Sequence, residues 1–233
     1  VNAGGASGYS NVAEATTLPD APVAPSNLAA KDTTQTTLVL TWQDNANDET
    51  SVEVFQADSA NGSFRRIAVL PANSTTHLVP TLLVNKMYRF RVRMVNGGGA
   101  GQFSNEISVQ TLPFPPEAPT LVVAQTISQT AIRLRWRNTA GTLTQTRVEQ
   151  STDGRTFALA QTLAATVDGT NVENLRMNTV YYFRLQHVNR GGVSPYSAVV
   201  SDTTFGTIPA APVNLRAENL RPRSVRLRWD DRS

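Results

Sequence analysis

The sequence predicts an all-β protein built from tandem antiparallel β-sandwiches of seven strands each. The first observation is a short strand ending in tryptophan, which occurs three times, at residues 37–42, 131–136 and 224–229. Apolar side chains occupy every second position of each copy, which is the pattern of a strand with one buried face. The second observation is the spacing of the tryptophans, which lie 94 and then 93 residues apart. Such a spacing indicates a repeated domain, and no segment between the copies has a helical period.

A second repeated pattern marks the end of each repeat. Asn2, Asn96 and Asn189 are each followed by glycines, and an aromatic residue comes seven positions after each asparagine. Because Asn and Gly tolerate positive φ, the pattern predicts the hairpin turn between the last two strands of a repeat. A proline-bearing stretch then leads into the next repeat, and we expect it to be a semi-rigid joint because proline fixes φ.

These patterns divide the chain into four segments. Residues 1–18 are expected to be the C-terminal strands of a preceding repeat, 19–112 and 113–205 two complete repeats, and 206–233 the first strands of a following repeat. The two incomplete repeats lack the middle strands that would close a core between them. The natural polypeptide is therefore expected to continue with further repeats beyond both ends.

Each complete repeat accommodates seven short strands with turn residues between them, which is typical of an antiparallel sandwich. The strands expected in the first are 27–29, 37–42, 51–57, 63–70, 75–79, 87–95 and 102–111. The first of these follows the proline stretch, and the others carry alternating apolar residues, with Phe64 and Ile67 expected to face inward. The strands expected in the second are 120–122, 131–136, 147–150, 157–163, 170–172, 181–188 and 196–203.

The core of each repeat can be assigned from the same patterns. A leucine lies six residues before the tyrosine that starts a Tyr-x-Phe-Arg strand in both repeats. Such a tyrosine can bury its ring and return its hydroxyl to the backbone upstream, a tyrosine corner. The residues expected to carry the cores are Trp42, Leu82, Tyr88, Phe90, Trp136, Leu175, Tyr181, Phe183 and Trp229.

With the tryptophan strand, the leucine–tyrosine pair and the Val-Asn-Gly turn, the whole chain resembles a tandem array of fibronectin type III domains. The stretch Trp42-Gln43-Asp44-Asn45, followed by Asp48-Glu49-Thr50, is similar to the bacterial version of the family. The resemblance implies an immunoglobulin-like sandwich for each repeat. It does not imply one function, because a fold hosts many functions.

Composition narrows the class of protein. The chain has no cysteine, which excludes a disulfide framework and a thiolate metal site. Its net charge of +3, with 19 arginines and 2 lysines, is too mild to require a polyanionic partner. No apolar run is long enough to span a membrane, and no signal-peptide pattern opens the chain.

The residues that usually carry chemistry are sparse. His77 and His187 fall in different repeats, so they do not form a metal site or a catalytic pair, and His187 is expected to be a neutral inward-facing side chain. The acidic stretch of Asp44, Asp48 and Glu49 could offer oxygen ligands to calcium, but the alternative is a loop whose side chains cap local turns. No nucleophile elbow, glycine-rich phosphate loop or zinc motif occurs, and no nucleophile, base and orienting group cluster, so no enzyme activity, cofactor or metal is expected.

Arginine rows are the most visible polar feature. Arg133, Arg135, Arg137, Arg226 and Arg228 alternate along two tryptophan strands. A basic stripe can contact a sulfated glycan or nucleic acid through charge. The alternative is a solvated sheet face whose arginine stems cover apolar surface beside carboxylates, and this alternative is favoured also for the row at residues 89, 91 and 93.

Taken together, these features predict a non-catalytic segment of a long secreted or cell-surface bacterial protein, an extended rod or filament component for spacing, display or adhesion. The expected partners are neighbouring repeats of the same polypeptide, copies of itself in a filament, and surface or matrix polysaccharide, with no nucleic acid and no membrane insertion. Two alternatives remain: a ligand-binding array for polyanions or glycans, and spacer modules of a secreted polysaccharide-degrading enzyme. The glycosylation sequons at Asn61 and Asn73 have meaning only in a eukaryotic secretory pathway.

Overall fold

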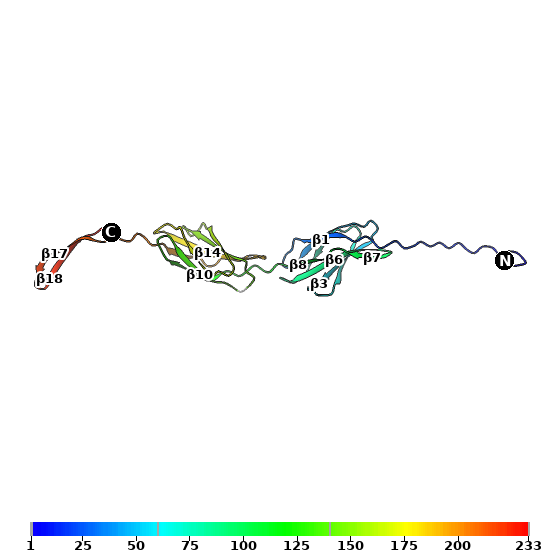
Figure 1. The fold of residues 1–233 in the computed structure, drawn as a ribbon, viewed down its shortest axis with the longest axis horizontal. Helices are drawn as coiled ribbons and strands as arrows, with labels where there is room; N and C mark the ends of the chain where they lie inside the picture. Colours follow the sequence, from blue (N-terminus) through cyan, green and yellow to red (C-terminus); the bar gives the residue numbers. More distant parts are fainter. Residues whose placement is uncertain (1, 60, 140, 233) are drawn as a thin grey trace. The chain divides into compact units, whose positions relative to one another are not determined.

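The computed structural model describes residues 2–59, 61–139 and 141–232, and strands are the only regular elements in that part of the chain. The chain divides into two compact units, residues 1–114 and 115–233. Each unit contains one antiparallel arrangement of two sheets, called here the first sandwich (β1–β8) and the second sandwich (β9–β16) (Figure 1). The all-β class predicted from the sequence is confirmed.

The first sandwich places a three-stranded sheet against a five-stranded one. The smaller sheet has the order β1-β2-β5, and the larger has the order β4-β3-β6-β7, with β8 also paired to β6. Their strands are β1 (Ser26–Lys31), β2 (Leu38–Gln43), β3 (Ser51–Ala57), β4 (Arg65–Pro71), β5 (Thr76–Val79), β6 (Met87–Asn96), β7 (Gly99–Phe103) and β8 (Ile107–Gln110).

One expected strand, residues 102–111, is split into β7 and β8. Asn105 lies in the gap, where its side chain accepts from the N–H of Leu28 at 2.9 Å and donates to the C=O of Leu28 at 2.9 Å. The pairing of β1 with β2 shifts register between Ser26 and Ala29, so Leu28 has no partner on β2. The side chain of Asn105 thus provides hydrogen-bond partners for the N–H and C=O of Leu28, which β2 does not supply.

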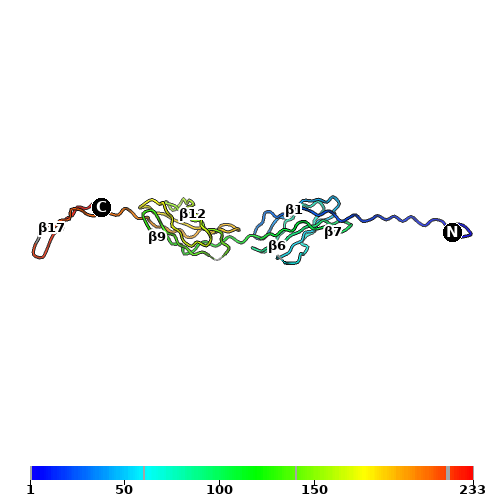
Figure 2. The backbone as a smooth tube through the Cα atoms, in the orientation of Figure 1, coloured from blue at the N-terminus to red at the C-terminus, as the bar shows by residue number. Residues whose placement is uncertain are grey.

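The second sandwich repeats this arrangement. Its smaller sheet has the order β13-β10-β9, and its larger sheet has the order β12-β11-β14-β15, with β16 paired to β14. The strands are β9 (Thr120–Thr126), β10 (Ile132–Arg137), β11 (Gln145–Ser151), β12 (Ala158–Ala164), β13 (Gly169–Val172), β14 (Val180–Asn189), β15 (Gly192–Val193) and β16 (Val200–Thr203). Figure 2 traces the same path as a continuous tube.

Two separate apolar cores hold the sandwiches together. Trp42 and Trp136 are each 6% exposed, and Phe90 and Phe183 are completely buried between their sheets. Leu82, Leu175, Tyr88 and Tyr181 are also buried. Every second residue of β6 and β14 is buried, which places the other residues, including the arginines, on the outer face.

The two tyrosines form the corner that their position predicts. The Tyr88 hydroxyl accepts a hydrogen bond from the N–H of Leu83 at 2.8 Å, and the Tyr181 hydroxyl accepts one from the N–H of Arg176 at 2.9 Å. Each ring is therefore buried without leaving its polar atom unpaired, and the loop before the strand is tied to the core.

The proline-bearing segments before β1 and before β9 lie against the sandwich that each of them precedes. Pro22 and Pro25 are buried on the first sandwich, and Pro116 and Pro119 on the second. In the first sandwich the backbone of Pro22 passes so close to Gly101 that a Cβ there would lie 2.3 Å from the Pro22 oxygen. Gly101 on β7 is thus required by the close approach of this backbone.

Residues 213–230 form a hairpin of β17 (Val213–Arg221) and β18 (Ser224–Asp230), a sheet of two strands. Trp229 was expected in a core, but it is 53% exposed, with Leu227 and Val225 each 51% exposed. The reason is that β17 and β18 pair only with each other in the described part of the chain, so no second sheet covers their apolar face. Among residues 2–25 the only pairing is an isolated bridge between Asn2 and Gly5.

Candidate functional site

The outer face of β6 carries an arginine that is tied to a buried carboxylate. Glu53 on β3 is only 6% exposed and accepts from Arg93 Nε at 2.8 Å and Arg93 Nη2 at 2.7 Å. Arg66 on β4 also contacts Glu53. Burial raises the pKa of the Glu53 carboxyl, but the hydrogen bonds from Arg93 and Arg66 outweigh it and hold the pKa below its usual value. Three adjacent strands are thereby linked on one face.

Aromatic rings cover the neighbouring arginine. The guanidinium of Arg91 lies 3.7 Å from the Phe103 ring centroid and 4.1 Å from that of Phe64. Phe64 was expected to face inward, but it precedes β4, which begins at Arg65, and its half-buried ring lies over the arginines of the outer face. The stack offsets the cost of covering a guanidinium that has no carboxylate partner among the described residues.

A single arginine repeats this arrangement in the second sandwich. Arg184 Nη2 lies 2.7 Å from Glu149 Oε2, and its guanidinium lies 3.6 Å from the ring centroid of Tyr196 and 4.2 Å from that of Phe157. The Tyr196 hydroxyl donates to Glu149 at 3.0 Å. Burial and this hydrogen bond raise the pKa of Tyr196. The outward arginines of β6 and β14 are therefore engaged within their own domains.

The outer face of β10 differs. Arg133, Arg135 and Arg137 alternate with the buried Leu134 and Trp136, as the sequence pattern predicts. Arg133 Nε donates to Asn171 Oδ1 on β13 at 3.2 Å. Among the described residues, none of the three arginines lies within ion-pair distance of a carboxylate. Their charge therefore faces solvent.

An open depression lies on this face. It has a volume of about 620 Å³ and is lined by residues of β10, of β13 and of the loop before β13: Arg133, Leu134, Arg135, Trp136, Asp168, Gly169, Thr170 and Asn171. Gly169 pairs with Arg135 and Asn171 with Arg133 across the two strands. Sequence reasoning missed the β13 residues as partners of the arginines, because the register of β13 with β10 joins segments far apart in the chain.

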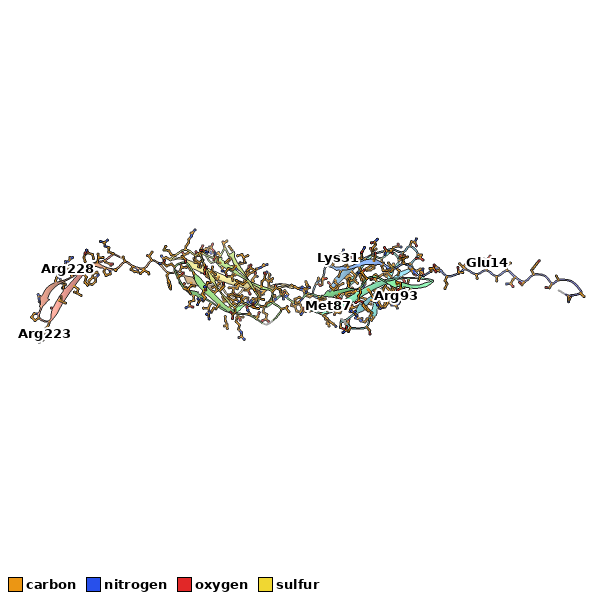
Figure 3. All side chains as sticks on the ribbon, in the orientation of Figure 1. Glu14, Lys31, Met87, Arg93, Arg223 and Arg228 are labelled. Carbon is orange, nitrogen blue, oxygen red and sulfur yellow. The ribbon has the colours of Figure 1, made fainter. Side chains whose placement is uncertain are left out.

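The hairpin arginines have a different environment. Arg228 Nε lies 3.2 Å from Glu218 Oε2, and Arg216 Nε lies 3.0 Å from Glu218 Oε1. Arg226 is exposed and is the cross-strand neighbour of Glu218. Figure 3 labels Arg228 and Arg223 on this hairpin and Arg93 on the first sandwich. The hairpin thus brings a carboxylate to its arginines, in contrast to β10.

The remaining polar candidates make structural contacts. Asp44 accepts from the N–H of Ala46 at 3.0 Å, and Asp48 from the side-chain amide of Asn96 at 2.9 Å. Glu49 accepts from the N–H of Asn73 at 2.7 Å. The three acidic residues weighed as calcium ligands therefore each cap or cross-link a loop. No group of three metal-ligating side chains occurs among the described residues.

His187 occupies the place on β14 that Met94 occupies on β6, and its side chain is completely buried. Its Nε2 lies 3.1 Å from Asn138 Oδ1, and its Nδ1 lies 3.2 Å from the carbonyl oxygen of Glu117 and 3.3 Å from the Thr139 hydroxyl. Burial lowers the pKa of His187, opposed by the hydrogen bond to Glu117. The ring thus attaches the proline-bearing segment to the sandwich. His77 lies in the first sandwich.

The comparison with known families agrees with this geometry. The fibronectin type III domain profile matches residues 23–110 and again 117–203. The chain belongs to this family. Each match covers one sandwich, which confirms the tandem fibronectin type III arrangement inferred from the tryptophan, tyrosine and turn patterns.

Proteins similar to this chain include several animal proteins. Protein sidekick-1 of Mus musculus is 34% identical over 163 residues, covering 65% of this chain and 7% of its own length. Fibronectin type-III domain-containing protein 3a of Gallus gallus is 28% identical over 201 residues, covering 84% of this chain and 16% of its own length. This fibronectin type III chain thus spans less than a fifth of these relatives. The bacterial source suggested by the Asp44–Thr50 region finds no support in them.

A solved structure shows the same fold. The FN1–FN3 domains of chicken CNTN1 superpose with a TM-score of 0.51 at 20% identity, covering 80% of this chain and 69% of that one. No helix of the described residues could cross a membrane.

Proposed function

We propose that the chain is a non-catalytic structural segment of an extracellular multi-domain protein. Its two fibronectin type III domains space and display neighbouring modules and contribute to adhesion. The partners are further domains of the same polypeptide. The polar groups that usually perform catalysis make loop-capping and core contacts instead, as Asp48 and His187 do.

The observation that carries this proposal is the shortness of the joint between the two sandwiches. The N–H of Leu112 still donates to the carbonyl of Thr34 at 2.9 Å in the first sandwich, and Pro116 is already buried on the second. Only residues 113–115 lie between these two points, and two of them are prolines. A joint this short, with φ fixed at two positions, favours a narrow range of domain orientations over free tumbling.

Attachment of the segment after the joint supports the same conclusion. The Thr139 hydroxyl donates to the Glu117 carbonyl at 3.2 Å, and Pro115 lies next to Gly192, the first residue of β15. These contacts belong to the second sandwich itself. They make the joint an extension of a folded domain rather than a flexible linker, as a spacing function requires.

Distance distributions between spin labels test this proposal. Because the chain has no cysteine, Lys31→Cys and Glu173→Cys, both at exposed positions, give one label on each sandwich. We expect a narrow distribution in double electron–electron resonance. It should broaden in Pro113→Gly/Pro115→Gly, because glycine releases φ in the joint.

The matched control is Pro80→Gly/Pro195→Gly, which changes two exposed prolines outside the joint. This variant should keep the narrow distribution. If the unmodified chain gave a distribution as broad as that of the joint variant, the domains would tumble freely and the spacing function would be wrong.

A further inference from the structure

We infer that the depression on β10 and β13 of the second sandwich binds an acidic polysaccharide, with sulfate or carboxylate groups on Arg133 and Arg135. This would add a ligand site to the proposed spacing function. The inference rests on the contrast between this face and the arginine-bearing outer faces of β6 and β14.

On β6 and β14 the outward arginines are neutralised by a carboxylate or covered by aromatic rings. Arg93 and Arg184 each contact a carboxylate at 2.7 Å, and Arg91 stacks on two rings. By contrast, the side chain of Arg133 donates to the neutral amide of Asn171, and Arg135 has no carboxylate within ion-pair distance among the described residues. A guanidinium fixed by a neutral partner keeps its charge and most of its donors available to an anion.

The shape of the face is set by a glycine. Gly169 lies across from Arg135, and a Cβ there would meet the carbonyl oxygen of Leu134 at 3.1 Å and Arg135 Cγ at 3.4 Å. Without a side chain, the strand leaves the space beside the Arg135 stem open. The depression therefore depends on the glycine at position 169 as well as on the arginines.

The first sandwich supplies an internal comparison. At the positions of Arg133 and Arg135 it has Val39 and Thr41, and β5 places Leu78 and Thr76 opposite them. The same two strands in the same register thus present an uncharged face with side chains at every position. Neither the charge nor the opening is needed to build the fold, so both are particular to the second sandwich.

The chemistry of the face favours a saccharide over a nucleic acid. Alternate residues of a strand lie about 7 Å apart, so the three β10 arginines form a row about 14 Å long that suits anionic groups spaced along an extended chain. The side-chain oxygens of Asn171 and Asp168 can accept from sugar hydroxyls. The outward residues on β9 opposite the arginines are Val123 and Gln125, so no aromatic ring is offered there for base stacking.

Binding to defined oligosaccharides tests the inference. A heparin hexasaccharide probes sulfate groups and a hyaluronan hexasaccharide probes carboxylates, each titrated into the full chain by isothermal calorimetry at two salt concentrations. Arg133→Val/Arg135→Thr installs the residues of the first sandwich. It should lower the affinity for the hexasaccharide that binds by about tenfold or more and reduce the dependence of this affinity on salt. Gly169→Thr, which places a side chain in the depression without changing the charge, should lower this affinity as well.

The charge-matched control is Arg155→Ser/Arg176→Ser, which removes two exposed arginines of the same unit that do not line the depression. It should leave affinity within about twofold at fixed salt. Thermal melts establish that each variant is folded. Three results would overturn the inference: no binding of either hexasaccharide, an equal loss in the control variant, or a DNA dodecamer bound more tightly than both sugars through the same arginines.

Discussion

Arg93 on β6 and Arg135 on β10 are both outward-facing arginines on β-strands, yet their surroundings give them different roles. Arg93 meets the buried carboxylate of Glu53 and becomes part of the architecture. Arg135 lies opposite Gly169, which has no side chain, so its guanidinium remains available to a ligand. Because the effect of a guanidinium depends on whether a carboxylate lies within reach, its cross-strand neighbours decide whether it is structural or available to a ligand.

His187 provides a prediction at the same scale. Burial lowers its pKa from the ordinary value of 6.5. As pH falls, the unfolded chain therefore takes up the proton first. The contribution to stability is fully present above the unfolded pKa and is lost as pH falls through the folded pKa.

We expect the melting temperature of the second sandwich to fall between about pH 7.5 and about pH 5.5 more steeply than in His187→Met, which places the methionine of the first sandwich in the same position. Thermal melts across this range measure the two slopes. The comparison is made in a His77→Thr background, because burial also lowers the pKa of His77. Equal slopes with and without His187 would contradict the prediction.

At the scale of the element, the strand that ends in tryptophan occurs in two settings. In β2 and β10 it lies between sheets, and Trp42 and Trp136 are each 6% exposed. In β18 the same pattern lies in a two-stranded hairpin, and Trp229 is 53% exposed. The alternation alone therefore specifies which face of the strand is apolar, and burial depends on a second sheet.

Replacing each tryptophan with alanine distinguishes the buried from the exposed setting. Trp42→Ala or Trp136→Ala should lower the free energy of unfolding by about 3–5 kcal/mol, because a large buried ring leaves a cavity. Urea titrations followed by circular dichroism measure this loss. Trp229→Ala is the control and should change stability little. A comparable loss in all three variants would mean that the hairpin tryptophan is buried in solution.

At the scale of the whole molecule, the chain contains two cores that share no residue. Each sandwich closes its sheets around its own tryptophan and its own tyrosine corner. Stability in such an array is approximately the sum of the domains plus terms between neighbours.

Differential scanning calorimetry should therefore resolve two transitions, or one that deconvolutes into two. Trp136→Ala should lower the temperature of one transition and leave the other in place, and Trp42→Ala should do the converse. If either variant shifted both transitions equally, the two sandwiches would unfold as one cooperative unit.

The sequence by itself determined the elements, the inward tryptophans and tyrosines of both sandwiches and the fibronectin type III family. These follow from the period of two and from turn residues, which act within a few positions of the chain. It misplaced Phe64, whose ring stacks on the outer arginines, and it did not foresee the gap at Asn105. Both depend on contacts with strands distant in sequence.

Only the tertiary structure decided which row of arginines lacks carboxylate and aromatic partners. The residues flanking Arg91 and Arg135 in the chain are equally apolar in both rows, so nothing local distinguishes them. The difference lies in the partners that pairing brings alongside: Glu53, Phe64 and Phe103 around β6, and Gly169 and Asn171 beside β10. Long-range register sets these neighbours, and a pattern with a period of two carries no information about them.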